Sequence, residues 1–386
     1  MSKIVAFFMA IIMFLIPSAN IPKQSLDTDN AKTEYTYVFV HGLSGWGEYD
    51  FVYKLAPYWG VLGGDLMKYL RARGVDAHAA SVDPTASAWD RACELYAQLT
   101  GTRVDYGVEH SERCGHERFG TDYTGKALID SWSAEDKINI LGHSFGGATV
   151  LTLVKLMANG SEAEQAATPA DEISDLFTGG KGDWFHSVTA LSAPINGTTA
   201  YYVQSDIESD KAHSTTEEKV DVKLIGTATA GPKDRADFDC AAYDMYLDNA
   251  MALADTFEVL DDVYYFSIPT AKTTQNDDGT WSPVKKEMEP LFHAASARMG
   301  TYTGVTPGGY VVDESWQQND GLVNTKSARA PFNAPQQDLD KDNIQPGIWN
   351  IFPTYDGDHT SLMGGILHRN EIRTLYMDLI NMINAL

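Results

Sequence analysis

The chain has 386 residues, 44% apolar and 21% charged, which is the composition of a globular protein long enough for one large domain or two smaller ones. Its formal net charge of −24 argues against nucleic acid or an anionic membrane as a partner, because both carry charge of the same sign. The three cysteines, Cys93, Cys114 and Cys240, are too few for a disulfide scaffold. One bridge remains open, with no basis for choosing the pair.

The first residues have the pattern of a targeting segment. Lys3 supplies a positive charge, Ile4–Ile16 form an apolar stretch of 13 residues, and Pro17-Ser18-Ala19 end it with small residues. This stretch is shorter than the roughly 20 apolar residues that span a bilayer. We therefore expect residues 1–19 to be a cleaved signal peptide. The mature chain is then expected to be secreted and to contain no integral membrane segment.

The first part of the remaining chain alternates expected strands and helices. A polar, glycine-rich excursion over residues 100–125 precedes the third strand. The rhythm is typical of a parallel sheet with crossover helices. The expected elements, in chain order, are a strand at Tyr35–Val40, a helix at Leu62–Arg73, a strand at Val75–Val82, a helix at Ser87–Leu99, a strand at Ile138–Leu141 and a helix at Ala148–Asn159.

The second part keeps this rhythm with one interruption. Residues 199–256 scatter apolar residues among charges, and we interpret them as an insertion that forms a lid over a site, with an ordinary helical decoration as the alternative. The remaining expected elements are strands at Ser187–Ser192, Asp262–Ile268, Trp281–Val284 and Ile348–Phe352, and a helix at Glu371–Leu386 capped by Asn370.

The sequence Gly142-His143-Ser144-Phe145-Gly146 lies between an expected strand and an expected helix. Gly-x-Ser-x-Gly in that context is a nucleophile elbow, in which the turn is so tight that only glycine fits beside the serine. We therefore predict Ser144 as a nucleophile. The fold class predicted is an α/β-hydrolase, with a central, mostly parallel sheet flanked by helices in a single domain over residues 20–386.

An oxyanion hole is expected beside this serine. The strand Tyr35–Val40 runs into His41-Gly42-Leu43, a pattern typical of an oxyanion loop. The predicted donors are the backbone N–H groups of Leu43 and of Phe145, the residue after the nucleophile.

A serine nucleophile needs a base and an acid, which in this fold follow it in the order acid, then histidine. Asp320 lies in an expected turn, and only His359 and His368 follow it among the histidines. Because His368 directly precedes the last helix, where a surface role is expected, His359 is the predicted base and Asp320 the predicted acid. The other carboxylates considered are Asp313, Asp356 and Asp358.

Several stretches of the chain resemble the Geobacillus-type and staphylococcal lipases of bacterial lipase families I.5 and I.6. The resemblance runs from about residue 35 to the C-terminus. The Trp-Asp-Arg-Ala-Cys block and the Val-Asp-Tyr-Gly that follows are specific to this group, whereas elbows are common to all α/β-hydrolases. The matching stretches are His41–Gly47, Tyr58–Gly60, Trp89–Leu99, Val104–Gly107, His116–Gly120, the elbow, Asn319–Asn324 and Asp358-His359.

The resemblance implies a structural Zn²⁺ bound by two aspartates and two histidines. Taken without it, Asp90, His110 and His116 favour surface histidines over a metal site. With it, the ligands fall on these three residues and on Asp244, with Asp248 as the fallback. The closed set of four would tie the excursion over residues 100–125 to the insertion.

The chain departs from the family at two places. Where the family has its calcium ligands, this sequence has Ser361 and Gly364-Gly365-Ile366-Leu367, so no calcium site of that type is expected. The region between Thr198 and Asp244 is also shorter than in the Geobacillus lipases. A smaller lid leaves a more open cleft, which leaves chain-length preference and interfacial activation open and admits bulky or polymeric esters.

Together these features predict a secreted serine carboxylic-ester hydrolase, a lipase or esterase of class EC 3.1.1 that acts through an acyl-enzyme on lipid or polymer esters. Two alternatives remain. One is an acyltransferase or peptidase of the same fold, and the other is a catalytically silent exported binding protein. The sequence does not predict an oligomeric state.

Overall fold

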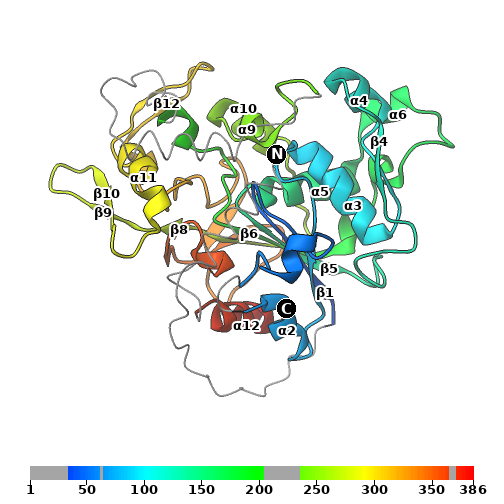
Figure 1. Cartoon of the computed structure of the whole chain (residues 1–386), viewed down its shortest axis with the longest axis horizontal. Helices are drawn as coiled ribbons and strands as arrows, with labels where there is room; N and C mark the ends of the chain where they lie inside the picture. The colour runs from blue at the N-terminus through cyan, green and yellow to red at the C-terminus, as the bar shows by residue number, and fades with distance from the viewer. Residues whose placement is uncertain (1–33, 61–63, 204–234, 365–370) are drawn as a thin grey trace.

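The structure is a computed structural model of the chain and describes residues 34–60, 64–203, 235–364 and 371–386. Its centre is a seven-stranded sheet in which every neighbouring pair is parallel (Figure 1). In spatial order its strands are β13 (Gln336–Asp338), β14 (Trp349–Ile351), β7 (Tyr264–Ile268), β6 (Phe185–Leu191), β5 (Ile138–His143), β1 (Thr36–Val40) and β2 (Ala77–Ala80).

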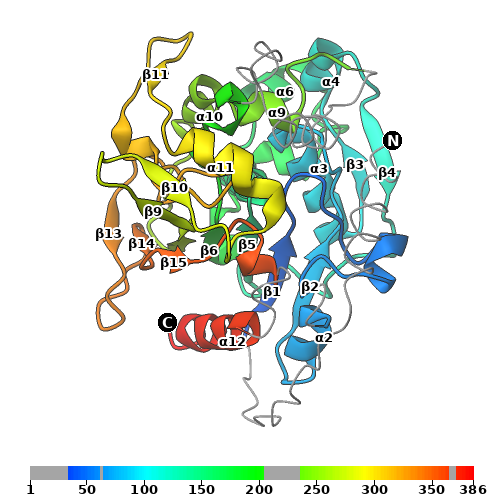
Figure 2. The ribbon, with the colours of Figure 1, turned by 60° about the vertical axis from the view of Figure 1, so that its left-hand side comes forward.

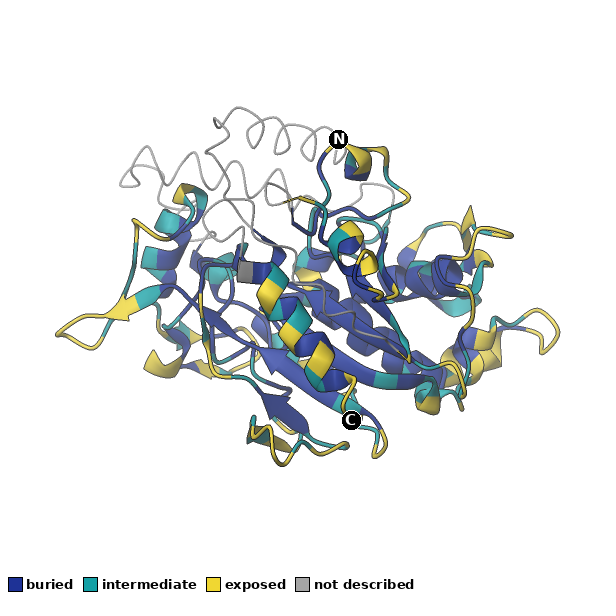
Figure 3. Ribbon diagram, turned by 90° about the horizontal axis from the view of Figure 1, so that it is seen from below, coloured by how far each residue is buried: buried dark blue, intermediate teal, exposed yellow. Residues whose placement is uncertain are grey.

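Alternate residues of the strands face two separate hydrophobic layers. In β1, Val38 and Val40 pack in the layer with α3 (Ala88–Thr100) and α5 (Gly146–Asn159), whereas Tyr37 and Phe39 pack in the other. That second layer contains α2 (Leu66–Arg71) and α12 (Glu371–Ile383), which lie side by side in Figure 2. Covered on both faces, the central strands of the sheet are mostly buried, as the dark blue ribbon in Figure 3 shows, whereas the edge strand β13 is largely exposed.

Smaller elements surround this core. The short helices are α4 (Val108–Cys114), α6 (Glu162–Ala167), α9 (Ala241–Asp244), α10 (Leu247–Ala254) and α11 (His293–Met299). The two-stranded sheets pair β3 (Arg103–Asp105) with β4 (Phe119–Asp122), β9 (Thr273–Gln275) with β10 (Trp281–Pro283), β11 (Gly304–Val305) with β12 (Val311–Val312), and β8 (Thr270–Ala271) with β15 (Tyr355–Asp356). The 3₁₀ turns are η1 (Phe51–Lys54), η2 (Asp175–Thr178), η3 (Gly182–Trp184), η4 (Pro290–Phe292), η5 (Glu314–Trp316) and η6 (Ser361–Met363).

The predicted fold class is confirmed. The predicted strands coincide with β1, β2, β5, β6, β7, β10 and β14, and the predicted helices with α2, α3, α5 and α12, with shifted ends. The excursion over residues 100–125 forms β3, α4 and β4. Of the expected insertion, residues 204–234 lie outside the described residues, and α9 and α10 belong to the rest.

Two further expectations concern termini and cysteines. The expected signal peptide, residues 1–19, and the expected helix cap Asn370 lie outside the described residues. Within the described ranges, no helix is both long and apolar enough to cross a membrane. Cys93, Cys114 and Cys240 are all free thiols.

Candidate active site and metal cluster

Ser144 occupies a tight turn between β5 and α5. Its φ of 55° lies in the left-handed region, which is unusual for a residue other than glycine. A Cβ on Gly142 would approach the carbonyl oxygen of Gly146 to 2.3 Å, and one on Gly146 would approach the carbonyl oxygen of Val40 to 2.4 Å. Both glycines are therefore required for the turn that places Ser144 at the carboxyl edge of the sheet.

The side chain of His359 lies between Ser144 and Asp320. His359 Nδ1 is 2.9 Å from Asp320 Oδ2, and His359 Nε2 is 2.8 Å from Ser144 Oγ. Because an ionised carboxylate only accepts hydrogen bonds, the Nδ1 proton is donated to Asp320, and Nε2 then accepts the hydroxyl proton of Ser144. Three residues far apart in the sequence thus form one directed hydrogen-bond chain.

Asp320 is held as a buried carboxylate. Its Oδ1 accepts the N–H groups of Leu322 and Val323 at 3.0 and 2.8 Å, and its Oδ2 accepts the hydroxyl of Thr270 at 2.6 Å. Burial by itself would raise the pKa of Asp320, but the charge and hydrogen bond of His359 and the bond from Thr270 outweigh it, so the pKa lies below its ordinary value. Asp320 is therefore ionised at neutral pH.

The other carboxylates considered from the sequence point elsewhere. Asp313 caps η5 through the N–H of Ser315. Asp356 pairs with Lys272, and Asp358 accepts the N–H of Glu289 at 2.8 Å. None of the three hydrogen-bonds to His359. His368 lies outside the described residues.

The expected oxyanion loop packs directly on the nucleophile. A Cβ on Gly42 would approach the Cβ of Ser144 to 2.6 Å, so this loop position has to be glycine. Within the described part of the chain, the backbone N–H groups of Leu43 and Phe145 have no hydrogen-bond acceptor. Two donors beside the serine are thus available to a ligand oxygen.

Sequence reasoning did not identify Arg91 as a site residue, although it lies in the Trp-Asp-Arg-Ala-Cys block. This fully buried side chain reaches from α3 to the oxyanion loop, where it donates to the carbonyl oxygen of His41. It also donates to the carbonyl oxygen of Asp83, after β2, at 2.9 Å. Its Nε donates to Thr149 Oγ1 on α5 at 2.8 Å. One guanidinium therefore connects the loop to the helix that follows Ser144.

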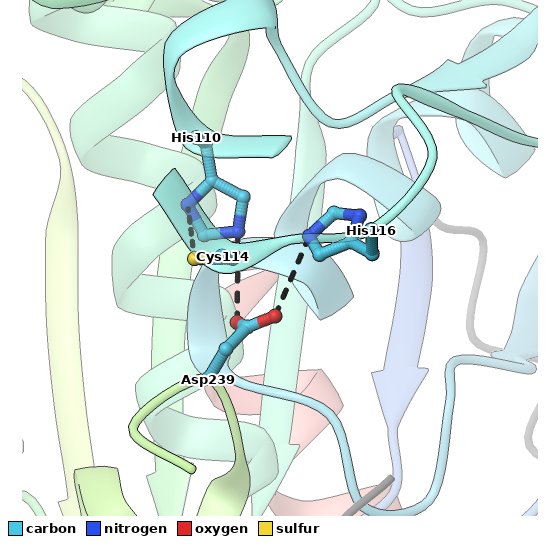
Figure 4. Close-up of side chains that lie close together, drawn as sticks. All are labelled: His110, Cys114, His116 and Asp239. Carbon is cyan, nitrogen blue, oxygen red and sulfur yellow. Dashed lines mark hydrogen bonds and ion pairs between the residues drawn. The ribbon is translucent and has the colours of Figure 1, made fainter. Parts of the chain in front are cut away.

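A second cluster of polar side chains lies where α3, α4 and the segment before α9 meet (Figure 4). His110 Nε2 is 2.9 Å from Asp90 Oδ1 and 3.5 Å from Asp239 Oδ1. His116 Nε2 is 3.4 Å from Asp239 Oδ2 and 3.8 Å from Asp90 Oδ1. Two imidazoles and two carboxylates thus converge, and three of these four residues are ones to which the family resemblance assigned the ligands.

The prediction of Asp244 as the fourth ligand is wrong. In the structure, the second carboxylate beside the histidines, after Asp90, belongs to Asp239. Asp244 lies in α9, where its Oδ2 accepts the N–H of Ala88 at the start of α3 at 2.7 Å. A carboxylate at that position is favoured by the helix dipole. The fallback, Asp248, accepts the hydroxyl of Thr306 and the N–H of Gly308 instead.

The residues of the cluster fit a metal ion. His116 Nδ1 lies 2.9 Å from the carbonyl oxygen of Glu117, so it carries the proton and leaves Nε2 as an acceptor toward the cluster. His116 Nε2 and Asp239 Oδ1 are buried without a hydrogen-bond partner, a costly state that a cation would relieve. The guanidinium of Arg235 supplies a positive charge to Asp90 and Asp239 here.

Cys114 joins this cluster, which the sequence did not predict. It follows His110 by one turn of α4, and its Sγ is 3.8 Å from His110 Nδ1, the ring nitrogen that faces away from Asp90.

At the position of the family's calcium ligands, the hydroxyl of Ser361 donates to Asp358 at 3.0 Å, and residues 365–367 lie outside the described residues.

A serine on a strand–turn–helix elbow, with a histidine and a carboxylate from later loops of a parallel sheet, defines the α/β-hydrolase class. Residues 33–213 match the family described as "Lipase-like, C-terminal domain". Two solved structures are similar over nearly the whole chain. EstA from Clostridium botulinum is 30% identical with a TM-score of 0.80, and the match covers 96% of this chain and 92% of EstA. Lipase 1 from Pelosinus fermentans is 30% identical with a TM-score of 0.74, and the match covers 92% of this chain and 99% of that lipase.

Among curated proteins, Lipase 1 of Staphylococcus aureus strain MRSA252 is 31% identical over an alignment of 358 residues that covers 86% of this chain and 51% of that protein. This chain therefore spans about half the length of the curated relatives that it matches. It belongs to the staphylococcal-type family of bacterial lipases.

Proposed function

We propose that this protein is an exported serine hydrolase that cleaves carboxylic esters, as a lipase or esterase. The observation that carries the proposal is the position of His359, within 2.8 Å of Ser144 Oγ and 2.9 Å of Asp320 Oδ2. This is the constellation that activates a serine for acyl transfer. Membership of a lipase family and the names of the similar proteins support it. Export rests on the composition of residues 1–19.

The chemistry follows from the direction of the hydrogen bonds. Ser144 Oγ attacks the acyl carbon while His359 Nε2 takes its proton, and Asp320 stabilises the imidazolium that results. The N–H groups of Leu43 and Phe145 receive the developing oxyanion, each worth about 3 kcal/mol to the transition state. His359 then protonates the leaving alcohol, and water, deprotonated by His359, hydrolyses the acyl-enzyme.

We further propose that Asp90, His110, His116 and Asp239 hold a structural Zn²⁺. Two oxygen and two nitrogen donors are the number and kind of ligands that a structural zinc site uses, and a Zn²⁺ held by all four would have no position left for substrate. A bound Zn²⁺ would supply a positive charge and a cross-link between α3, α4 and the segment before α9. No step of ester hydrolysis passes through it.

The test is hydrolysis of a panel of p-nitrophenyl esters from short to long acyl chains, together with one insoluble polyester. Ser144→Ala is expected to lower turnover by at least about 10³-fold while the protein remains folded by circular dichroism. Turnover retained by Ser144→Ala would remove this serine from the mechanism. The acyl chain length with the highest kcat/KM distinguishes a lipase from an esterase, and competing alcohols reveal any acyl transfer.

A further inference from the structure

A second hydrogen-bond chain runs behind Ser144, through two side chains that the proposed mechanism does not use. The N–H of Gly42 donates to Tyr58 Oη at 3.2 Å, and Tyr58 Oη lies 2.7 Å from His143 Nδ1. His143 Nε2 lies 2.9 Å from the carbonyl oxygen of His359. Tyr58 and His143 are 5% and 1% exposed, so water does not compete for these bonds.

The protons in this chain can point in only one direction. The carbonyl oxygen of His359 can only accept, so His143 carries its proton on Nε2 and has an acceptor at Nδ1. The hydroxyl of Tyr58 accepts from Gly42 and has one proton to give, which goes to His143 Nδ1. Every donor in the chain is thus matched to one acceptor.

This direction depends on a neutral His143. A second proton on its ring would place an N–H against the Tyr58 hydroxyl and a positive charge beside His359, whose ring centre is 5.0 Å away. Burial, and then the charge of His359, lower the pKa of His143 to about 3. The hydrogen bonds through Tyr58 and His143 therefore keep the same donors and acceptors across the neutral pH range.

The two ends of this hydrogen-bond chain, at Gly42 and His359, lie in the two halves of the proposed active site. Gly42 directly precedes Leu43, the proposed oxyanion donor. At the other end, the N–H of His359 donates to the carbonyl oxygen of Asp320 at 2.9 Å while its own carbonyl receives His143. Both backbone groups of the proposed base are therefore fixed, one of them by the residue next to the nucleophile.

We propose that Tyr58 and His143 are positioning residues, whose directed hydrogen-bond chain holds the oxyanion loop and the His359 loop in the relative position that ester hydrolysis requires. The inference rests on the proposed function. Neither side chain touches the reacting atoms, so the loss of either displaces a donor and the base together. Small displacements of that kind lower the rate of the chemical step more than substrate binding.

The test compares Tyr58→Phe with Tyr37→Phe, which loses the hydroxyl of another buried tyrosine of the same hydrophobic layer. The partners of that hydroxyl are Asn384 and the carbonyl oxygen of Ile380, at the end of α12 and away from the site residues. The measured quantities are kcat and KM for p-nitrophenyl butyrate, with kcat expressed per active site labelled by a fluorophosphonate. Misfolded protein is not labelled and so does not affect kcat. We expect Tyr58→Phe to lower kcat about tenfold or more, with KM near the wild-type value and Tyr37→Phe unchanged. Equal kcat in both variants would overturn the inference.

A matched pair at His143 tests the chain independently. In His143→Gln the amide nitrogen can reach the Nε2 position and still donate to the carbonyl of His359, whereas the shorter side chain of His143→Asn reaches only the Nδ1 position. We expect Gln to retain more kcat than Asn, and Tyr58→Phe to add little to His143→Asn. Additive losses, or equal losses in the Gln and Asn variants, would contradict one shared chain. An inactive, unlabelled wild-type protein would instead refute the proposed function itself.

Discussion

The guanidinium carbon of Arg91 lies 5.2 Å from the centre of the Phe145 ring. The same guanidinium is hydrogen-bonded to carbonyl oxygens of the oxyanion loop and the neighbouring Asp83. Because Phe145 and Leu43 carry the two proposed oxyanion donors, one buried side chain contacts both sides of the proposed hole. Arginine suits this position because its planar fork donates several hydrogen bonds in fixed directions.

Arg91→Lys is therefore expected to lower kcat about tenfold although the charge is retained, because an ammonium group cannot replace the fork. The control is Arg73→Lys. Arg73 is also buried and lies 3.6 Å from the ring centre of Tyr69, but it makes no contact with the site. Steady-state kinetics and a thermal melt of each variant provide the measurement. Wild-type kcat in Arg91→Lys would show that the hole forms without this brace.

The metal cluster predicts a difference between two aspartates that are five residues apart. Elemental analysis of the purified protein is expected to find about one Zn²⁺ per chain. Asp239→Asn is expected to lose most of it, whereas Asp244→Asn retains it, because Asp244 binds the N–H of Ala88 instead. A chelator is expected to lower the Tm of the wild-type protein. Protein that contains no metal, or that loses it in Asp244→Asn alone, would contradict the assignment.

The two buried histidines next to the site predict acid sensitivity. Burial, with Arg91 nearby, lowers the pKa of His41 to about 3, and burial lowers that of His143 to about 3. Between these values and the ordinary histidine pKa near 6.5 the unfolded chain binds protons that the folded chain does not, so stability falls as the pH falls. Each histidine adds up to about 1.4 kcal/mol per pH unit to the slope of the free energy of unfolding against pH.

His143→Gln is expected to make the free energy of unfolding depend less steeply on pH between pH 6.5 and 5, because one histidine that binds a proton only in the unfolded chain is lost. Urea unfolding at each pH measures this dependence. His78→Gln is the control. Although partial burial opposes it, the carboxylates of Asp76 and Glu48 raise the pKa of His78 to about 9. His78 is therefore protonated in the folded state throughout this range, and below pH 6 it is largely protonated in the unfolded chain as well, so it adds little to the slope there. Equal slopes for the wild-type protein and His143→Gln would contradict a neutral, buried His143.

Local patterns made much of the fold predictable. The elbow at Ser144 needs only a short strand, two glycines and a helix with apolar residues at helical spacing, all of which lie within β5 and α5. By contrast, β13 has the polar sequence Gln336-Gln337-Asp338 and is a strand because it pairs with β14. Its existence depends on tertiary contacts that no local window contains.

The fourth metal ligand was unpredictable for a similar reason. Phe238-Asp239 and Tyr243-Asp244 have the same aromatic–aspartate pattern. Which carboxylate faces His110 depends on where α9 begins, since Cys240 is its N-cap and Asp244 lies within it. The bracing role of Arg91 and the chain from Tyr58 to His359 depend on packing between segments that are distant in the sequence.

The central claim is that Ser144, His359 and Asp320 act as one unit. The most direct measurement is fluorophosphonate labelling of the intact protein, with the adduct mapped by mass spectrometry of its peptides. We predict one adduct per chain, on Ser144, formed at least about 10²-fold more slowly in His359→Ala. An adduct on another residue, or labelling of Ser144 at the same rate without His359, would contradict the account.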